Sequence, residues 1–543
     1  MSSPVVPSRI ALVAIAVVVL VVLSNAWVCD DAYITFRVAD NVLAGHGPRW
    51  NVDERVQAYS NPLWLAAFTP LYALLGDAWS AALLLGVGCT ATTLWLSRSL
   101  APGTAAYVAL CAGAAGSKAF VDYATSGLEN PLAALLLVVF ALRLRALVVD
   151  AGDDTTPAVT IRQVALLSLV AAALMINRLD AALLVAPALL ALPWLLRRRL
   201  APRPWLLGGA LGTLPLLGWL GFAAFYYGHP LPNTAAAKLQ TGWTPGALAS
   251  QGLWYLADSL QRDPLTLFVV AAGMLTSLLQ PRRWTLALAA GVALHLGYIV
   301  SIGGDFMSGR FLTAPLVLGA LLLLQLRVPK AWQGGERLRL ALRLLPIAGW
   351  LNPEGPIVNP PYFAGAISLD EAVTRYITPD DHGICDERAF YYPSTAVAFA
   401  ARLPRVPDHP WRALGEQAAQ QAARSPERPG RTARIFGSMT SVGYAGFYAG
   451  PQVFLVDRYA LVDAFVASLP PRAPAQRIGH IERDLPAGYL ESRAEDRDLL
   501  RDATLHERYA EVALRTRAPL LAEGRLAAIV AAMVRRAPPP APR

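Results

Sequence analysis

The chain has 543 residues, of which 55% are hydrophobic and 16% are charged, and its formal net charge is +9. Soluble domains carry about 25% charged residues, so the composition excludes an ordinary soluble protein and predicts an integral membrane protein. The apolar residues are mostly leucine, alanine and valine, which favours α-helical spans over a β-barrel. The arginines stand near the ends of apolar stretches, which indicates a topology signal and no nucleic-acid partner.

The first apolar stretch runs from about Ile10 to Val28 and is long enough to cross roughly 30 Å of hydrocarbon. Its end, Ser24–Trp27, is a poor signal-peptide cleavage site, so we expect a retained first helix. Two aspartates, Asp30 and Asp31, follow directly at the predicted membrane–water boundary. Ionisable groups at this level are expensive and are therefore functional candidates. The alternative is that they only cap a helix or mark the interface.

Apolar stretches of span length recur along the chain and predict about eleven transmembrane helices. They cover residues 9–28, 78–97, 102–117, 131–148, 163–178, 180–196, 205–225, 264–280, 284–301, 310–326 and 337–351. The apolar stretch 63–75 is too short to cross easily and predicts an interfacial helix in the first loop.

Arginine and lysine residues fall at alternate ends of these spans. The positive-inside rule then places the N-terminus in the cytoplasm and the C-terminus outside a bacterial cytoplasmic (inner) membrane. We expect a transmembrane domain over 1–351 with a first external loop at 29–77, an extracytoplasmic (periplasmic) domain over 352–536 and a disordered tail over 537–543.

The segment after 352 predicts a small mixed α/β domain. Ala433–Phe436 and Val453–Val456 are short β-like runs separated by a Gly/Tyr-rich segment, and Asp370–Ile377 and Arg412–Ala423 have helical patterns. The predicted fold class is thus an α-helical polytopic membrane protein with a C-terminal mixed α/β extracytoplasmic domain.

Unusual polar residues gather in the predicted external segments, whereas the cytoplasmic loops show only generic basic residues. Besides the two aspartates they include Tyr33, Tyr59, Asn61, Glu129, Arg178, Asp180, His229, Asn233, Lys238, Asp305 and Arg310. Their common side predicts one polar chamber that opens outward. Each has a plainer reading as well: Arg178 and Asp180 as an ion pair tying two helix ends, Asp305 as a helix N-cap, or Lys238 as a solvated charge.

Metal binding is not expected. His46 and His229 are loop histidines with no second ligand at a useful spacing. The four cysteines are too scattered for a zinc site or a disulfide framework; they are Cys29, Cys89, Cys111 and Cys385. We therefore expect no cofactor.

An outward-facing carboxylate beside basic groups suits transfer of a group from a lipid phosphate. The carboxylate deprotonates an acceptor hydroxyl, and an arginine or lysine stabilises the phosphate whose charge grows as it departs. A lipid-linked sugar is a suitable donor, because nucleotide sugars are not expected outside the cytoplasmic membrane.

Several short sequence segments, spread over nearly the whole chain, resemble those of a known family. They are Asp30-Asp31-Ala32-Tyr33-Ile34-Thr35-Phe36-Arg37, Tyr59-Ser60-Asn61-Pro62-Leu63-Trp64, Thr125-Ser126-Gly127-Leu128-Glu129, Tyr227-Gly228-His229-Pro230-Leu231-Pro232-Asn233-Thr234, Gly303-Gly304-Asp305-Phe306-Met307, Val456-Asp457-Arg458 and Leu461-Val462-Asp463. With these strings the chain resembles the GT-C superfamily of polyprenyl-phosphate-dependent glycosyltransferases. Within it, the chain is most similar to AftB-type arabinofuranosyltransferases and related bacterial enzymes, including those that glycosylate pilin.

The resemblance implies a GT-C fold and inversion of the sugar in one displacement, with a first-loop acid as general base. Asp30 is favoured as the base and Asp31 as an orienting group. Lys238, Arg310 and Arg178 are the implied contacts to the donor phosphate. The implied sugar or acceptor contacts are Tyr33, Tyr59, Asn61, Glu129, Asp180, His229, Asn233 and Asp305. His229 replaces an acidic residue expected in many relatives, which puts that contact in doubt.

The expected partners are a membrane lipid-linked sugar donor and a cell-envelope glycan or surface glycoprotein as acceptor. Two alternatives stay open: the same fold with another lipid-linked sugar, such as mannose or another hexose, and a lipid or solute transporter or flippase. Against the transporter, the spans show no inverted repeat and no paired broken helices. The sequence does not choose the acceptor, the linkage or the oligomeric state.

Overall fold

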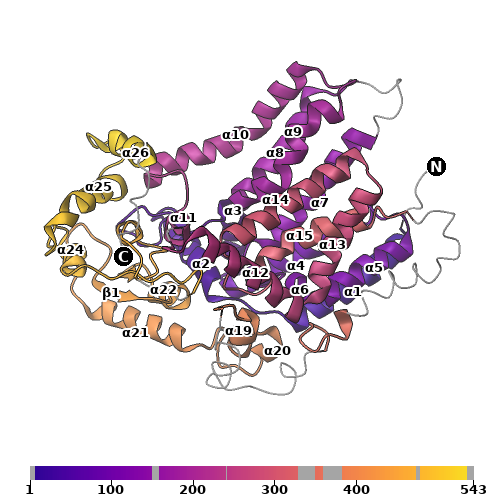
Figure 1. Cartoon of the computed structure of the whole chain (residues 1–543). Helices are drawn as coiled ribbons and strands as arrows, with labels where there is room; N and C mark the ends of the chain where they lie inside the picture. The colour runs from indigo at the N-terminus through magenta and orange to yellow at the C-terminus, as the bar shows by residue number, and fades with distance from the viewer. Residues whose placement is uncertain are drawn as a thin grey trace. The chain divides into compact units, whose positions relative to one another are not determined.

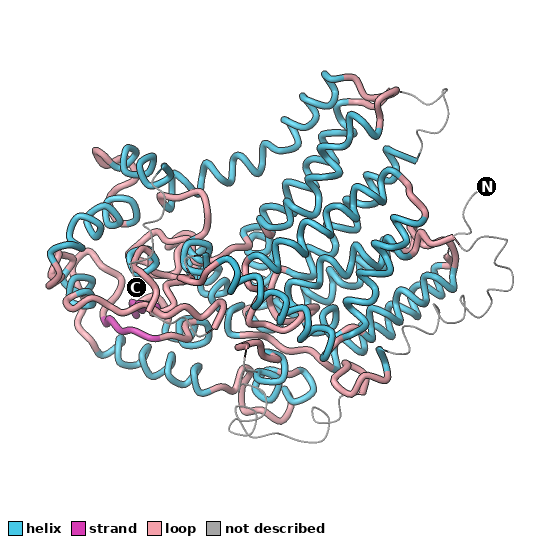
Figure 2. The backbone as a smooth tube through the Cα atoms, in the orientation of Figure 1, coloured by secondary structure: helices cyan, strands magenta, loops and turns pink. Residues whose placement is uncertain are grey.

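The computed structural model describes residues 6–149, 158–239, 241–327, 349–358, 382–472 and 477–534, and the fold is mostly helical (Figures 1 and 2). Its contacts divide the chain into two compact units. The first contains Met1–Val28, Ala82–Leu216 and Pro245–Leu403; the second contains Cys29–Ala81, Leu217–Thr244 and Pro404–Arg543. These units cut across the predicted boundary at residue 351, because the first loop packs with the C-terminal part of the chain.

The described part of the first unit is helical, and most of its long helices are apolar. They are α1 (Ser8–Ser24), α5 (Thr104–Gly116), α6 (Lys118–Asp122), α7 (Asn130–Val149), α8 (Ile161–Asn177), α9 (Ala182–Leu195), α12 (Pro245–Arg262), α13 (Pro264–Leu279), α14 (Arg283–Ser301), α15 (Thr313–Leu323), α19 (Glu387–Thr395) and α20 (Val397–Ala400). Short 3-10 turns at Leu179–Ala181 and Arg310–Leu312 lead into α9 and α15. Two long helices, α4 (Ala78–Ser97) and α10 (Pro202–Tyr227), begin in one unit and end in the other.

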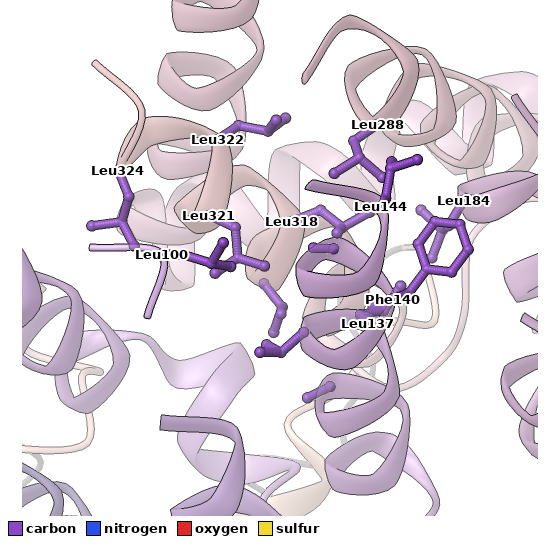
Figure 3. Close-up of a cluster of buried hydrophobic side chains, with 14 of the residues drawn as sticks. Leu100, Leu137, Phe140, Leu144, Leu184, Leu288, Leu318, Leu321, Leu322 and Leu324 are labelled. Carbon is purple, nitrogen blue, oxygen red and sulfur yellow. The ribbon is translucent and has the colours of Figure 1, made fainter. Parts of the chain in front are cut away.

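The core of the first unit contains buried residues from most of its long helices, and Figure 3 shows the part to which α7, α9, α14 and α15 contribute. Phe140, Leu184 and Leu288 are fully buried there. Glycine allows the closest approaches: a Cβ at Gly273 of α13 would lie 2.1 Å from the Gly319 carbonyl oxygen of α15. Small residues at helix contacts permit such close backbone packing within membranes.

Four helices of the described chain are long and apolar enough to cross a membrane: Ala78–Ser97, Asn130–Val148, Pro202–Tyr227 and Arg283–Ser301. The bent pair α12 and α13 would make five. The chain is thus a multi-pass membrane protein. The predicted count of about eleven is not confirmed, because the other described spans coincide with apolar helices of only 10–17 residues. The predicted span 337–351 lies mostly outside the described residues.

The second unit combines shorter helices with two strands. They are α2 (Asp30–Leu43), α3 (Pro62–Leu75), α11 (Asn233–Leu239), α21 (Pro410–Arg424), β1 (Ile435–Met439), α22 (Gly443–Ala449), β2 (Val453–Asp457), α23 (Ala464–Ala467), α24 (Tyr489–Glu495), α25 (His506–Thr516) and α26 (Arg525–Val534). The predicted interfacial helix and the predicted helix Arg412–Ala423 correspond to α3 and α21. The predicted helix Asp370–Ile377 and the tail 537–543 lie outside the described residues.

The strands β1 and β2 pair in parallel, with register from Ile435 opposite Val453 to Met439 opposite Asp457. Both β-like runs were predicted, the first two residues too early. A parallel pair needs a crossover connection, and the Gly/Tyr-rich segment supplies it by forming α22. The start of α22 is what positions the candidate site.

Candidate functional site

Asp30 is the first residue of α2, directly after the extended Cys29. Asp30 and Asp31 thus occupy the first turn, where the helix dipole favours negative charge. Asp30 is only 6% exposed, whereas Asp31 is half-buried. The two neighbouring carboxyls therefore differ in their access to solvent and to a substrate.

The carboxylate of Asp30 accepts two backbone hydrogen bonds from the start of α22. The N–H of Gly443 donates to Oδ2 at 3.0 Å and the N–H of Tyr444 donates to Oδ1 at 2.6 Å. First-turn N–H groups have no partner within their own helix, so Asp30 caps α22. Only glycine fits at position 443, because a Cβ there would lie 1.9 Å from the Asp30 backbone oxygen.

Burial raises the pKa of Asp30 to about 7, an effect that the Tyr444 N–H bond opposes and the Asp31 charge reinforces. A carboxylate has about four lone-pair positions, and these two bonds use two of them. Asp30 is therefore held in a fixed orientation and can still take up a proton. A pKa near neutrality is what efficient general-base catalysis requires.

Two other carboxyls of the second unit have a raised pKa but a different setting. Burial raises the pKa of Glu54 to about 7, although Arg493 forms an ion pair with it at 2.9 Å. Burial likewise raises the pKa of Asp457 to about 7, and its oxygens accept the N–H groups of Tyr459 and Leu461 in the turn after β2. Asp457 is completely enclosed, and Glu54 has a cationic partner, so Asp30 is the stronger candidate base.

Aromatic rings and one arginine fix α2 against α22. The Tyr33 ring lies 4.6 Å from that of Tyr444 and 5.2 Å from that of Phe447, measured between ring centroids. Arg37 donates to the Trp50 carbonyl oxygen at 2.9 Å and to the Val453 carbonyl oxygen at 2.8 Å. Tyr33, an expected substrate contact, therefore packs in an aromatic core, and Arg37 acts as a cross-link that holds Asp30 in register.

The other expected contacts of this unit lie in its loops and in α11. The hydroxyls of Tyr59 and Tyr227 are 2.8 Å apart, and Thr35 donates to Asn61 Oδ1 at 3.2 Å. Leu231 N–H donates to Nδ1 of His229 at 3.1 Å. Asn233 donates to the Ala460 carbonyl oxygen at 2.7 Å, which ties α11 to the segment after β2.

Lys238 lies in the last turn of α11 and is half-buried. Burial lowers the pKa of His480, and the charges of Arg477 and Lys238 lower it further. The lysine therefore contributes positive potential to a buried part of the second unit.

The remaining predicted residues meet in the first unit. Arg178 forms ion pairs at 2.8 Å with both Glu129 and Asp180. Arg310 lies 3.6 Å from Glu129 and 3.6 Å from Asp305. The sequence-based alternative of an Arg178–Asp180 pair between two helix ends is thus observed. Two guanidinium groups face three carboxylates here, which opposes the binding of a further anion.

His295 belongs to this cluster and was missed from the sequence. His295 lies on α14, and its Nε2 is 3.3 Å from Asp180 Oδ2. The available signal was a single ionisable residue in the middle of an apolar span. Among the described residues, no group of three or more His, Cys, Asp or Glu side chains is arranged to hold a metal ion.

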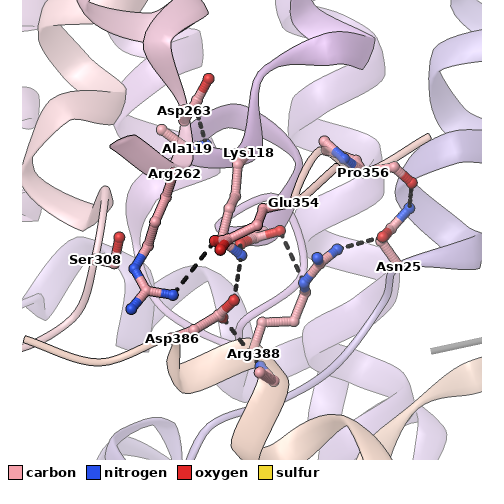
Figure 4. Close-up of polar contacts among 12 residues, drawn as sticks. Asn25, Lys118, Ala119, Arg262, Asp263, Ser308, Glu354, Pro356, Asp386 and Arg388 are labelled. Atoms are coloured by element: carbon pink, nitrogen blue, oxygen red, sulfur yellow. Dashed lines mark hydrogen bonds and ion pairs between the residues drawn. The ribbon is translucent and has the colours of Figure 1, made fainter. Parts of the chain in front are cut away.

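A second buried ionic network of the first unit was also missed (Figure 4). Lys118 forms ion pairs with Asp122 and, at 2.9 Å, with Asp386. Arg388 Nε lies 3.1 Å from Asp122 and its Nη1 donates to Asn25. These contacts join α6 and α19 to the end of α1, and the ions are matched in charge, so the network is structural.

Comparison with known proteins gives two related sequences. A terminal β-(1→2)-arabinofuranosyltransferase of Corynebacterium glutamicum is 31% identical over 329 residues, which are 54% of this chain and 47% of that protein. The protein of the same name from Mycobacterium tuberculosis is 28% identical over 437 residues, 71% of this chain and 65% of that protein. The chain is similar to terminal β-(1→2)-arabinofuranosyltransferases. The similarity confirms the resemblance to the arabinofuranosyltransferase branch.

The matched regions span about half to two thirds of the length of these relatives. No family model matches the sequence. Two solved structures resemble the fold, each with a TM-score of 0.45. ArnT from Cupriavidus metallidurans bound to undecaprenyl phosphate is 14% identical, and the match covers 87% of this chain and 89% of that one. The Archaeoglobus fulgidus oligosaccharyltransferase is 11% identical, and the match covers 83% of this chain and 64% of that one.

Proposed function

We propose that this protein is a membrane glycosyltransferase that transfers arabinofuranose from a polyprenyl-phosphate donor to a cell-envelope glycan or a surface protein such as pilin. The reaction is a single inverting displacement, and Asp30 is its general base. The sugar and a terminal β-(1→2) linkage come from the names of the two related proteins. Transfer of another lipid-linked sugar by the same machinery is the nearest variant of this proposal.

One observation carries the proposal: a buried carboxyl, oriented by two backbone N–H groups, begins the helix that follows the first apolar span. Burial raises the pKa of Asp30 to about 7, so a large fraction is deprotonated at neutral pH and the carboxylate is still basic enough to take a hydroxyl proton. Perturbed carboxyls of this kind cluster at functional sites.

In the proposed step, Asp30 takes the proton of the acceptor hydroxyl as the acceptor oxygen bonds to the anomeric carbon of the sugar. The bond from that carbon to the phosphate oxygen breaks, and polyprenyl phosphate departs with its negative charge. Asp31, half-buried beside the base, orients the acceptor. The step consumes no oxidant or reductant and needs only one proton acceptor.

Lys238 is our proposed contact to the departing phosphate, because it belongs to the same compact unit as Asp30 and its positive charge acts on a buried part of that unit, where it lowers the pKa of His480. Arg178 is less suitable, because Glu129 and Asp180 neutralise it at 2.8 Å. Arg310 is intermediate in suitability, because its ion pairs with Glu129 and Asp305 are longer, at 3.6 Å. Replacing Lys238 with alanine should raise KM for the lipid donor more than it lowers kcat.

The test uses the full chain in lipid nanodiscs with a synthetic polyprenyl-phosphoryl arabinofuranose and an arabinoside acceptor. Mass spectrometry should find a product one pentose heavier. Asp30→Asn should reduce the rate about 10²–10⁴-fold, the usual contribution of a positioned base. Asp40→Asn is the matched control, because Asp40 lies at the other end of α2 and accepts a hydrogen bond from Tyr72.

Full activity of Asp30→Asn with loss of activity in Asp31→Asn would move the base to Asp31. If neither the wild type nor the variants transferred sugar, and the protein moved lipid across sealed vesicles, these results would contradict the proposed function and support a transporter.

The proposed extracytoplasmic location of Asp30 is tested separately, by cysteine labelling in intact cells. Cys385 is buried and cannot report, so cysteines are introduced at the exposed positions Gln420 and Arg198. A membrane-impermeant maleimide should label Gln420→Cys from outside and Arg198→Cys only after lysis. The reverse pattern would place the base in the cytoplasm.

A further inference from the structure

The last described helix, α26, exposes an unusual face. The residues on it are Leu526, Val530, Met533 and Val534, which are 69%, 53%, 43% and 78% exposed. Their spacing of i, i+4, i+7 and i+8 puts them on one side of the helix. Arg525 and Ile529 of the same helix are buried. The outward side of α26 is therefore entirely apolar.

Another surface helix of the same unit shows what a water-facing helix looks like here. The exposed residues of α21 include Gln417, Gln420, Gln421 and Arg424. A helix at the surface of a soluble domain normally turns its polar side outward. The helix α26 has the opposite arrangement, with its one charged residue turned inward.

The start of α26 is fixed to the end of α10. Arg525 Nη2 donates to the Tyr226 carbonyl oxygen at 3.2 Å, and its guanidinium carbon lies 5.8 Å from the centroid of the Phe225 ring. Figure 1 shows α26 beside the C-terminal end of α10. The part of α10 in this unit, residues 217–227, also exposes apolar side chains, among them Leu217, Phe222 and Phe225.

The properties of α10 indicate what covers the exposed apolar side chains of α26 and of residues 217–227. This helix has 26 residues and is long and apolar enough to span a membrane. Only 17% of its apolar stretch is buried within the protein. Its final turns carry Trp219, Phe222, Phe225 and Tyr226, and aromatic side chains gather where a span meets the membrane–water interface. The contacts of Arg525 therefore hold the start of α26 at interface depth.

We propose that α26 is an interfacial anchor that lies in the surface of the bilayer, with Leu526, Val530, Met533 and Val534 among the lipid chains. Helices of this kind bury their apolar side roughly 5–10 Å into the boundary between head groups and acyl chains. Two further arginines, Arg535 and Arg536, follow in the sequence, where basic residues add attraction to anionic lipids. The anchor keeps the unit that contains Asp30 at the lipid surface.

The experiment labels single cysteines with a small environment-sensitive fluorophore in the full chain, reconstituted in nanodiscs of zwitterionic and anionic phospholipid. The four native cysteines are buried, so the introduced thiol reacts first. Val530→Cys and Met533→Cys report on the anchor. Gln420→Cys, on the polar side of α21, is the matched control.

We expect phospholipid with a doxyl quencher at carbon 5 to remove most of the fluorescence at positions 530 and 533, and iodide in the water to have little effect there. The control at 420 should show the reverse. Quenching at 530 and 533 by iodide as strong as at 420, with no effect of the doxyl lipid, would overturn the proposal. Protection from both quenchers together with cross-links between two copies would overturn it in favour of a protein interface.

Discussion

Two buried aspartates, one in each compact unit, both accept N–H groups from the first turn of a helix and differ in their charged partners. Asp30 accepts the N–H groups at the start of α22, and Asp386 accepts the N–H of Ala389 at 3.0 Å in the first turn of α19. They are 6% and 5% exposed. Asp386 also has the ammonium group of Lys118 at 2.9 Å.

The cations around Asp386 reverse its acid–base behaviour relative to that of Asp30. Burial raises the pKa of Asp30 to about 7. Burial acts on Asp386 in the same direction, but Lys118 and Arg388 lower the pKa of Asp386 below its ordinary value. A buried carboxyl held by neutral donors keeps its affinity for a proton, whereas one held by cations stays ionised and serves structure. The comparison explains why we assign chemistry to Asp30 alone.

The largest expected effect is that replacing Asp30 lowers activity, whereas replacing Asp386 lowers stability. Asp30→Asn should lower the transfer rate about 10²–10⁴-fold and leave folding nearly intact, because an amide cannot act as a base but still accepts an N–H bond. Asp386→Asn should instead destabilise the protein, because Lys118 loses a buried counter-ion. Transfer rates per folded molecule and thermal unfolding of both variants in nanodiscs measure the difference. Equal losses of activity in the two variants would remove the distinction.

Removal of the cation itself tests the structural side of the comparison. Lys118→Ala should destabilise folding by about 3–5 kcal/mol, because it leaves two carboxylates buried without their ammonium partner. The control is Arg434→Ala, whose partner Glu427 is 83% exposed, and solvent-exposed pairs contribute little. Similar unfolding midpoints for the two variants would show that the network of Lys118 does not stabilise the first unit.

A smaller effect is expected from the glycine that receives Asp30. Gly443→Ala should cost about 1–3 kcal/mol by overpacking, because its Cβ would lie 1.9 Å from the Asp30 backbone oxygen. Activity should fall with stability as the carboxylate loses its orientation. Gly437→Ala in β1 is the control, since its Cβ would make an ordinary 3.6 Å contact with Leu455. Equal activity of both variants would show that α22 does not position the base.

Local features of the fold could be predicted from the sequence. The helices α3 and α21 and both strands follow from apolar periodicity and β-branched content. The placement of Asp30 and Asp31 directly after the first apolar stretch singled them out, and neighbouring residues allowed the Arg178–Asp180 pair to be anticipated.

The partners of these residues could not be predicted, because they come from distant parts of the chain. The N–H groups that orient Asp30 lie 413 and 414 residues away. The Gly/Tyr-rich segment that supplies them gave no helical signal, since glycine and aromatic residues have low helix propensity. His295 and Lys118 are single ionisable residues whose roles depend on Asp180 and Asp386, and no local pattern reveals such pairings.

The most direct test of the central claim is the pH dependence of kcat/KM for sugar transfer by the full chain in nanodiscs. Because a general base acts in its deprotonated form and burial raises the pKa of Asp30 to about 7, kcat/KM should be level above pH 7 and fall about tenfold per unit well below it. The residual activity of Asp30→Asn should lack this limb. A wild-type profile that stays flat from about pH 5 to 8, or an unchanged limb in Asp30→Asn, would contradict the assignment of Asp30 as the base.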